Sequence, residues 1–164
     1  MRLTFDILSE PVDETYRQLL GQCAAYSSSV LMVVREPNRL TTSAQGLLED
    51  LRPHLLREEK VSEWPGTILL KELAEVYRYH LNIAVLQRLQ TAARALYQWV
   101  QPDLPEDLCL VRSDESPILV TIAHERDAYL VITEREAESL LVAIPYLKLH
   151  RRAQLDSRNL GTET

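Results

Sequence analysis

Residues 107–140 read DLCLVRSDESPILVTIAHERDAYLVITEREAESL, and this stretch decides the expected fold. It contains three short apolar runs separated by polar turns, at residues 108–112, 118–124 and 129–133. Strands so close together in sequence predict an antiparallel meander. Thr133 and Glu136 then match a capping box, which indicates that a helix begins directly after the third strand.

Upstream of the meander, strand and helix patterns alternate. The run Val30-Leu31-Met32-Val33-Val34 lies within residues 28–35 and predicts a strand buried on both faces. Residues 72–81 alternate as a half-buried strand does. Further strands are expected at residues 2–8, as a sheet edge, at 59–64, and at 67–70 after the Pro65-Gly66 turn.

Apolar residues at helical spacing predict three more helices. One covers residues 11–25 with Ser9 as its cap, and another begins at Thr42 and ends near Pro53. The clearest one starts at Asn82 and is expected to continue to Val100. Residues 148–152 are expected to form a basic helical end.

These elements predict an α+β fold. We expect a single domain over residues 1–155, with a mostly antiparallel sheet of about five or six strands packed by about four helices. The C-terminal meander is followed by the capped helix. Residues 156–164 are polar and are expected to form a frayed tail.

Composition limits the classes of function. The chain has 164 residues, 46% of them hydrophobic and 26% charged, which is ordinary for a globular protein. Its four glycines argue against a glycine-rich phosphate loop. Neither a signal peptide nor an apolar run of about 20 residues is present, so a cytoplasmic location is expected. Cys23 and Cys109 have apolar neighbours and are expected to be reduced core residues.

Negative charge is concentrated in one part of the chain. The net charge is -6, and residues 101–140 contain ten acids against three arginines. Such a surface repels nucleic acid and attracts a basic protein. The loop from Asp103 to Asp107 is stiffened by Pro105 within it and by Pro102 directly before it, which favours a docking element.

No catalytic motif is present, and no catalytic residue, cofactor or metal is expected. A protein-binding surface is the leading hypothesis, with Trp64 expected to be partly exposed beside a turn. The expected partner-binding residues are Asp103, Glu106, Asp107, Asp114, Glu115, Glu125, Asp127 and Trp64.

Three functions remain open. The first is a non-enzymatic cytoplasmic module, in a concrete version an immunity or inhibitor protein that neutralises a basic, nuclease-like partner without contacting nucleic acid or membrane itself. The second is a small enzyme or ligand-binding domain whose site is assembled from His80, His124 and Tyr129. The third is a homodimeric accessory subunit held by charge complementarity.

Overall fold

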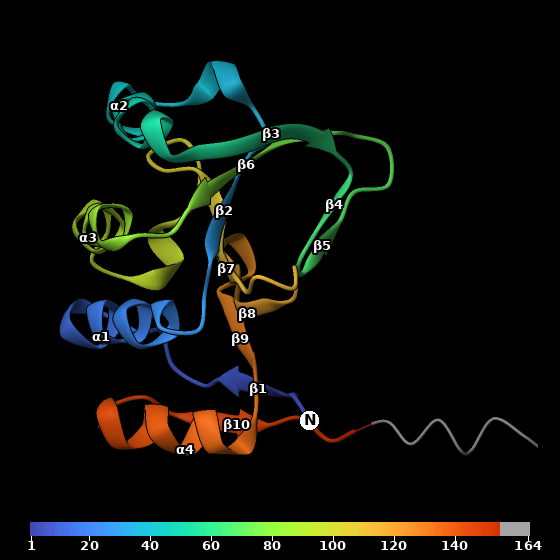
Figure 1. Cartoon of the computed structure of the whole chain (residues 1–164). Coiled ribbons are helices and arrows are strands. Elements are labelled where there is room, and N and C mark those ends of the chain that lie inside the picture. Colours follow the sequence, from blue (N-terminus) through green and yellow to red (C-terminus); the bar gives the residue numbers. More distant parts are fainter. Residues whose placement is uncertain (155–164) are drawn as a thin grey trace, which may run out of the picture.

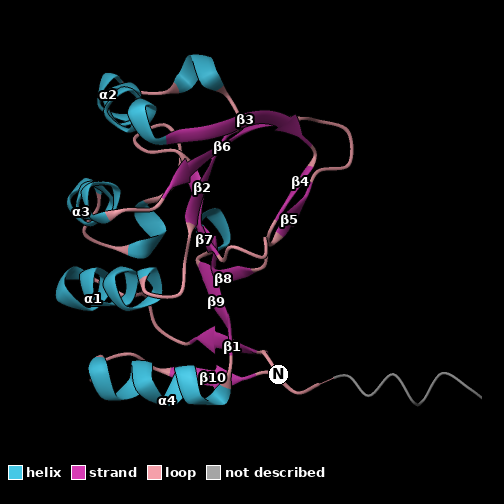
Figure 2. Cartoon of the chain, viewed as in Figure 1, coloured by secondary structure: helices cyan, strands magenta, loops and turns pink. Residues whose placement is uncertain are grey.

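The computed structural model describes residues 1–154 and is organised around an eight-stranded antiparallel sheet (Figures 1 and 2). From edge to edge the strands are β10 (Leu149–Arg151), β1 (Leu3–Ile7), β9 (Asp127–Ile132), β8 (Pro117–Ile122), β7 (Glu106–Val111), β2 (Ser29–Val34), β6 (Ala74–His80) and β3 (Leu55–Val61). The α+β class is confirmed. The expected strand number was too low, because β3 and β10 extend the sheet at its two edges.

The C-terminal meander and its helix follow the sequence prediction closely. β7, β8 and β9 pair in chain order, and α4 (Glu134–Ala143) begins directly after β9. Thr133 Oγ1 accepts a hydrogen bond from the Glu136 amide at 3.1 Å, and Glu136 Oε2 accepts one from the Thr133 amide at 2.9 Å. The capping box is therefore complete.

One face of the sheet carries the four α-helices of the described chain, which lie together at the left in Figure 1. Besides α4 they are α1 (Asp13–Ala24), α2 (Thr42–Leu51) and α3 (Ile83–Ala92). Their buried leucines pack with β2 side chains such as Val30 and Met32 to form the main core.

The other face of the sheet carries a small hairpin, β4 (Glu63–Trp64) and β5 (Thr67–Ile68). Gly66 makes its turn with φ 89°, a conformation that L-residues with a side chain rarely adopt. Trp64 packs beneath the hairpin in a second apolar cluster with Leu31, Val33 and Val120. β2 is consequently buried on both faces, as its continuous apolar run predicts.

Two predictions failed where a helical pattern was carried too far. α3 ends at Ala92, and residues 96–98 form a separate 3-10 turn. The chain leaves the helix because Ala95 forms a β-bridge with Val12, and Leu96 N donates to the Pro11 carbonyl at 3.1 Å.

The basic C-terminal segment is not a helical end. It forms β10, which pairs with β1, so β1 is an interior strand and not the expected sheet edge. The helix expected at residues 11–25 is present as α1, but its N-cap is Val12 and no side chain, including that of Ser9, caps it.

Both cysteines are free and buried, as expected. The predicted tail at residues 156–164 lies outside the described residues. Within residues 1–154, none of the helices has the length and apolar character that crossing a membrane requires.

Candidate functional site

The acidic segment is divided between the two ends of the sheet. β7 and β9 begin, and β8 ends, at the same end of the strands, because neighbouring antiparallel strands run in opposite directions. We call this end of the sheet the acidic end. It carries Glu106, Asp107, Glu125 and Asp127, with Asp103 in the loop before β7. The remaining acids of the segment lie at the opposite end of these strands or on α4.

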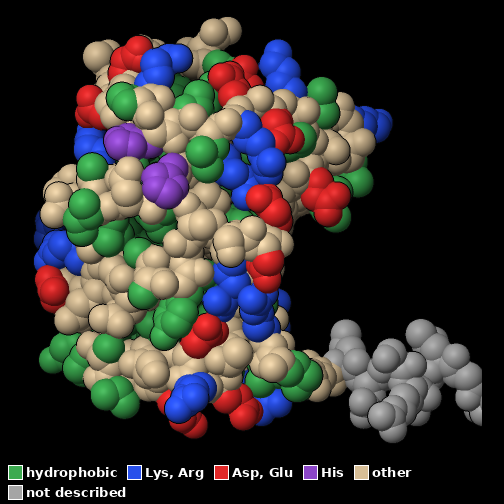
Figure 3. All heavy atoms as spheres, viewed as in Figure 1, with side chains coloured by type: hydrophobic (Ala, Val, Ile, Leu, Met, Phe, Trp, Pro, Cys, Tyr) green, Lys and Arg blue, Asp and Glu red, His purple; other side chains and the backbone are tan. Residues whose placement is uncertain are grey.

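Acids at the opposite end of the strands form ion pairs with arginines. Asp114 pairs with Arg2 at 2.9 Å. Glu115 lies 2.8 Å from Arg78 and 3.0 Å from Arg57. Hydrogen bonds from Ser116 hold the pKa of the Asp114 carboxyl well below its usual range. Basic and acidic side chains are also intermixed on the side of the molecule shown in Figure 3. Asp114 and Glu115 are therefore poor candidates for the expected acidic surface.

Acids at the acidic end lack such partners. Within the described chain, Asp103, Glu106, Asp107 and Asp127 take part in no ion pair; for Glu125 the pair is with His124, at 3.7 Å. Asp103 and Glu125 are exposed and Asp127 is half-buried. The negative charge that the sequence places in residues 101–140 is therefore uncompensated mainly here.

A β-bulge brings two consecutive carboxylates close together. Leu31 is paired with Cys109 but Val33 is paired with Glu106, so β7 contains one extra residue between these pairs. Asp107 lies in this bulge with φ 57°, a left-handed conformation that aspartate tolerates better than most residues. In a regular strand Glu106 and Asp107 would point to opposite faces. Here their carboxylate oxygens approach within 4.8 Å.

Asp107 is 1% exposed, and its carboxylate is held by two donors. The Trp64 indole Nε1 donates to Oδ2 at 3.0 Å, and the Ala123 amide donates to Oδ1 at 3.1 Å. Burial raises the pKa of the Asp107 carboxyl, and the two hydrogen bonds reduce that effect. The buried carboxylate thus joins the β4–β5 hairpin to the turn after β8.

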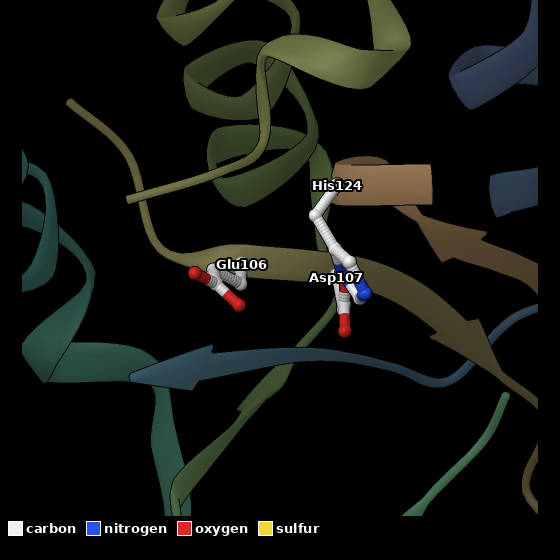
Figure 4. A group of neighbouring side chains, drawn as sticks. All are labelled: Glu106, Asp107 and His124. Carbon is white, nitrogen blue, oxygen red and sulfur yellow. The ribbon is translucent and has the colours of Figure 1, made fainter. Parts of the chain in front are cut away.

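Glu106 and His124 complete a three-residue cluster with Asp107 (Figure 4). Burial, and secondly the nearby Asp107, raises the pKa of the half-buried Glu106 carboxyl. His124 comes from the short turn at Ala123–Glu125, and its ring is directed toward Asp107. One ligand atom from each of the three residues lies within 4.8 Å of the others. Two carboxylates and an imidazole are a donor set suited to a divalent metal.

A cleft of about 410 Å³ adjoins Glu106. The Gln101 side chain fixes one wall, because its Oε1 accepts from Arg35 N at 2.7 Å and its Nε2 donates to the Glu36 carbonyl at 2.8 Å. Apart from Glu106, sequence reasoning missed the residues that line this cleft, since they come from separate segments with no local motif. The lining residues are Arg35, Glu36, Arg39, Glu72, Gln101, Pro102 and Glu106.

Two expected partner-binding residues are not at the surface. Trp64 is 4% exposed, because its ring packs on the sheet and its Nε1 is bonded to Asp107. The expectation of a partly exposed tryptophan was therefore wrong. Asp107, which accepts that hydrogen bond, is buried as well. The expected docking loop at residues 103–107 therefore exposes only the acids Asp103 and part of Glu106 to solvent.

The alternative ligand site is not assembled as expected. His80 is paired with Ser29 on β2, whereas Glu106 beside His124 is paired with Val33. Four residues along a strand separate these positions by about 13 Å. Tyr129 packs against the second apolar cluster, with the Arg152 guanidinium 4.7 Å from its ring centre. His124 therefore belongs with Glu106 and Asp107 instead.

Comparison with known proteins gives no family assignment: no protein-family model matches the chain, and no curated protein or solved structure is detectably similar to it.

Proposed function

We propose that the protein is a non-enzymatic binding module that docks a basic protein partner at the acidic end of its sheet. The observation that supports this proposal is the separation of its acids into a compensated and an uncompensated group. Asp114 and Glu115 are matched by arginines, whereas Asp103 and Asp127 form no ion pair with a described residue. A docking surface of this kind leaves its charges free for the partner.

The physical role of such a surface is to steer association. Uncompensated carboxylates on one side of a molecule attract a basic partner over several ångströms and raise the association rate, and salt screens this effect. A nuclease-like partner is the specific version that we favour, because such proteins carry a basic site for a polyanionic substrate. The module would then inhibit its partner by covering that site.

The proposal is tested with two charge-matched variants. The first neutralises the acidic end by Asp103→Asn, Glu125→Gln and Asp127→Asn. The control removes the same formal charge from exposed acids that form no ion pair with described residues. Its changes are Glu58→Gln, Glu63→Gln and Glu138→Gln.

The wild-type chain and both variants serve as baits in an extract of the native cells, and a protein retained by wild type is then purified. We expect a basic protein that the control variant retains. Its association with the acidic-end variant should be about tenfold slower at low salt, with the difference shrinking as salt rises. Equal association rates for the two variants, or capture of an acidic protein only, would refute the proposal.

A further inference from the structure

We infer that Glu106, Asp107 and His124 form a binding site for one divalent transition-metal ion. The three side chains come from two segments that the bulge in β7 and the turn after β8 bring together. Their ligand atoms lie within 4.8 Å of one another, so a cation placed between them would lie within about 2.8 Å of each before any adjustment. Coordination at about 2.0–2.2 Å then requires side-chain shifts of less than 1 Å or so.

A second observation, independent of this spacing, is the uncompensated charge of Asp107. Its carboxylate is 1% exposed, yet it makes no ion pair with any described lysine, arginine or histidine. The Arg35 guanidinium acts on it only at longer range. Its two hydrogen bonds offset only part of the cost of burying a carboxylate that has no cationic partner, and the second carboxylate on Glu106 beside it adds repulsion. A bound cation would relieve both effects.

The surroundings of Asp107 resemble those of a prepared metal ligand. Trp64 Nε1 and the Ala123 amide each donate to one carboxylate oxygen and fix its orientation, and each oxygen keeps a further lone pair. Such hydrogen bonds from outside the ligand set orient metal ligands and support their affinity. His124 is the adjustable member, because its side chain is 42% exposed and its ring can rotate toward a cation.

The donor set selects the class of metal. Imidazole nitrogen with two carboxylates suits Zn²⁺, Mn²⁺ or Co²⁺, whereas Mg²⁺ and Ca²⁺ prefer oxygen ligands alone. Three protein ligands leave at least one coordination position for solvent or for a donor from another molecule. Glu106 lines the cleft beside Arg35 and His124 is exposed, so two of the three ligands can be reached from the surface.

The test is calorimetric titration of the metal-free full-length chain with Zn²⁺ and with Co²⁺, with Mg²⁺ for comparison. We expect one saturable site for Zn²⁺ and Co²⁺, and visible absorption bands when Co²⁺ is bound. His124→Ala and Glu106→Gln should each weaken binding at least about tenfold. The matched controls His80→Ala and Glu138→Gln should bind as tightly as wild type, because neither residue lies at the cluster and Glu138 is exposed on α4.

Two results would overturn the inference. One is the absence of saturable Zn²⁺ or Co²⁺ binding to the wild-type chain, and the other is an equal loss of affinity in His80→Ala and His124→Ala. Folding is checked by circular dichroism, and the two ligand variants avoid Asp107, whose buried hydrogen bonds also serve stability. The acidic-end variant of the docking test keeps all three metal ligands. Failure of metal binding is therefore distinguishable from failure of partner binding.

Discussion

Trp64 and Asp107, 43 positions apart in the sequence, are joined by a 3.0 Å hydrogen bond from the indole Nε1 to a buried carboxylate oxygen. The bond fastens the β4–β5 hairpin to the bulge at the start of β7. It therefore connects the second apolar cluster to the acidic end of the sheet. Both residues were expected at a docking surface, and their burial indicates a positioning role instead.

Removing this bond should destabilise the fold. Trp64→Phe deletes the donor, and Asp107→Asn keeps a residue that tolerates the left-handed backbone but offers only one acceptor oxygen to two donors. Each change should lower the free energy of unfolding by about 1–3 kcal/mol. Chemical denaturation followed by circular dichroism measures both. The double variant should lose less than the sum of the single losses, and strict additivity would show that the two side chains are not coupled.

The ion pair between Arg112 and Glu136 should carry a pH-dependent part of the stability. The two side chains are only 10% and 16% exposed, and they are joined by hydrogen bonds of 2.9 and 3.2 Å. Although burial opposes ionisation, hydrogen bonds from Thr133 and Arg112 lower the pKa of the Glu136 carboxyl below 4.5. Because folding lowers the pKa of the Glu136 carboxyl, the ion pair stabilises the protein fully at pH values above the pKa of this carboxyl in the unfolded chain. The stabilisation is lost as the pH falls through the pKa of the same carboxyl in the folded protein.

Glu136→Gln should therefore cost about 3 kcal/mol at neutral pH, since it leaves a nearly buried guanidinium without its counter-charge. The difference from wild type should shrink as the pH is lowered through and below the ordinary carboxyl range. Urea denaturation across this range provides the measurement. Glu134→Gln is the control, because the side chain of Glu134 is 62% exposed and its pair with Arg151 should contribute at most about 1 kcal/mol. A loss in Glu136→Gln that is constant with pH would contradict the assignment.

Gly66 and Gly46 should respond in opposite ways to alanine. A Cβ at Gly66 would lie 2.8 Å from Val120 Cγ1, and the backbone there has φ 89°. Gly66→Ala should cost about 1–3 kcal/mol through this strain. A Cβ at Gly46, within α2, meets nothing within 4 Å, and Gly46→Ala should raise stability by about 0.5–1 kcal/mol. Thermal unfolding of the two variants compares them directly; a tolerated Gly66→Ala would show that the hairpin does not hold this geometry.

The two thiols should be unreactive in the folded protein. Burial raises the pKa of both Cys23 and Cys109 to about 12, so almost no thiolate is present at neutral pH. A chromogenic disulfide reagent should label neither thiol in native buffer and both in denaturant. The Cys23→Ala and Cys109→Ala variants assign each reaction. Rapid labelling of either thiol without denaturant would reveal local opening of the core.

Much of the fold could be predicted from the sequence because its signals are local. The capping box at Thr133 and the Asn82 cap each depend on a few neighbouring residues, and both are present in the structure. The apolar run in β2 likewise predicts burial on both faces without any knowledge of its neighbours. The failures occurred where a distant segment competed with local preference, as when Val12 bridges Ala95 beyond the end of α3.

The candidate site depended on distant contacts far more than the fold did. The sequence by itself determined that residues 101–140 carry an excess of acids within a meander and a capped helix. Only the tertiary structure decided which of those acids are neutralised, by placing Arg2 and Arg78 beside Asp114 and Glu115. It also decided that Glu106 and Asp107 meet His124. The physical reason is that caps and periodicity act over one or two turns of chain, whereas ion pairs and a bulge depend on strand order and register.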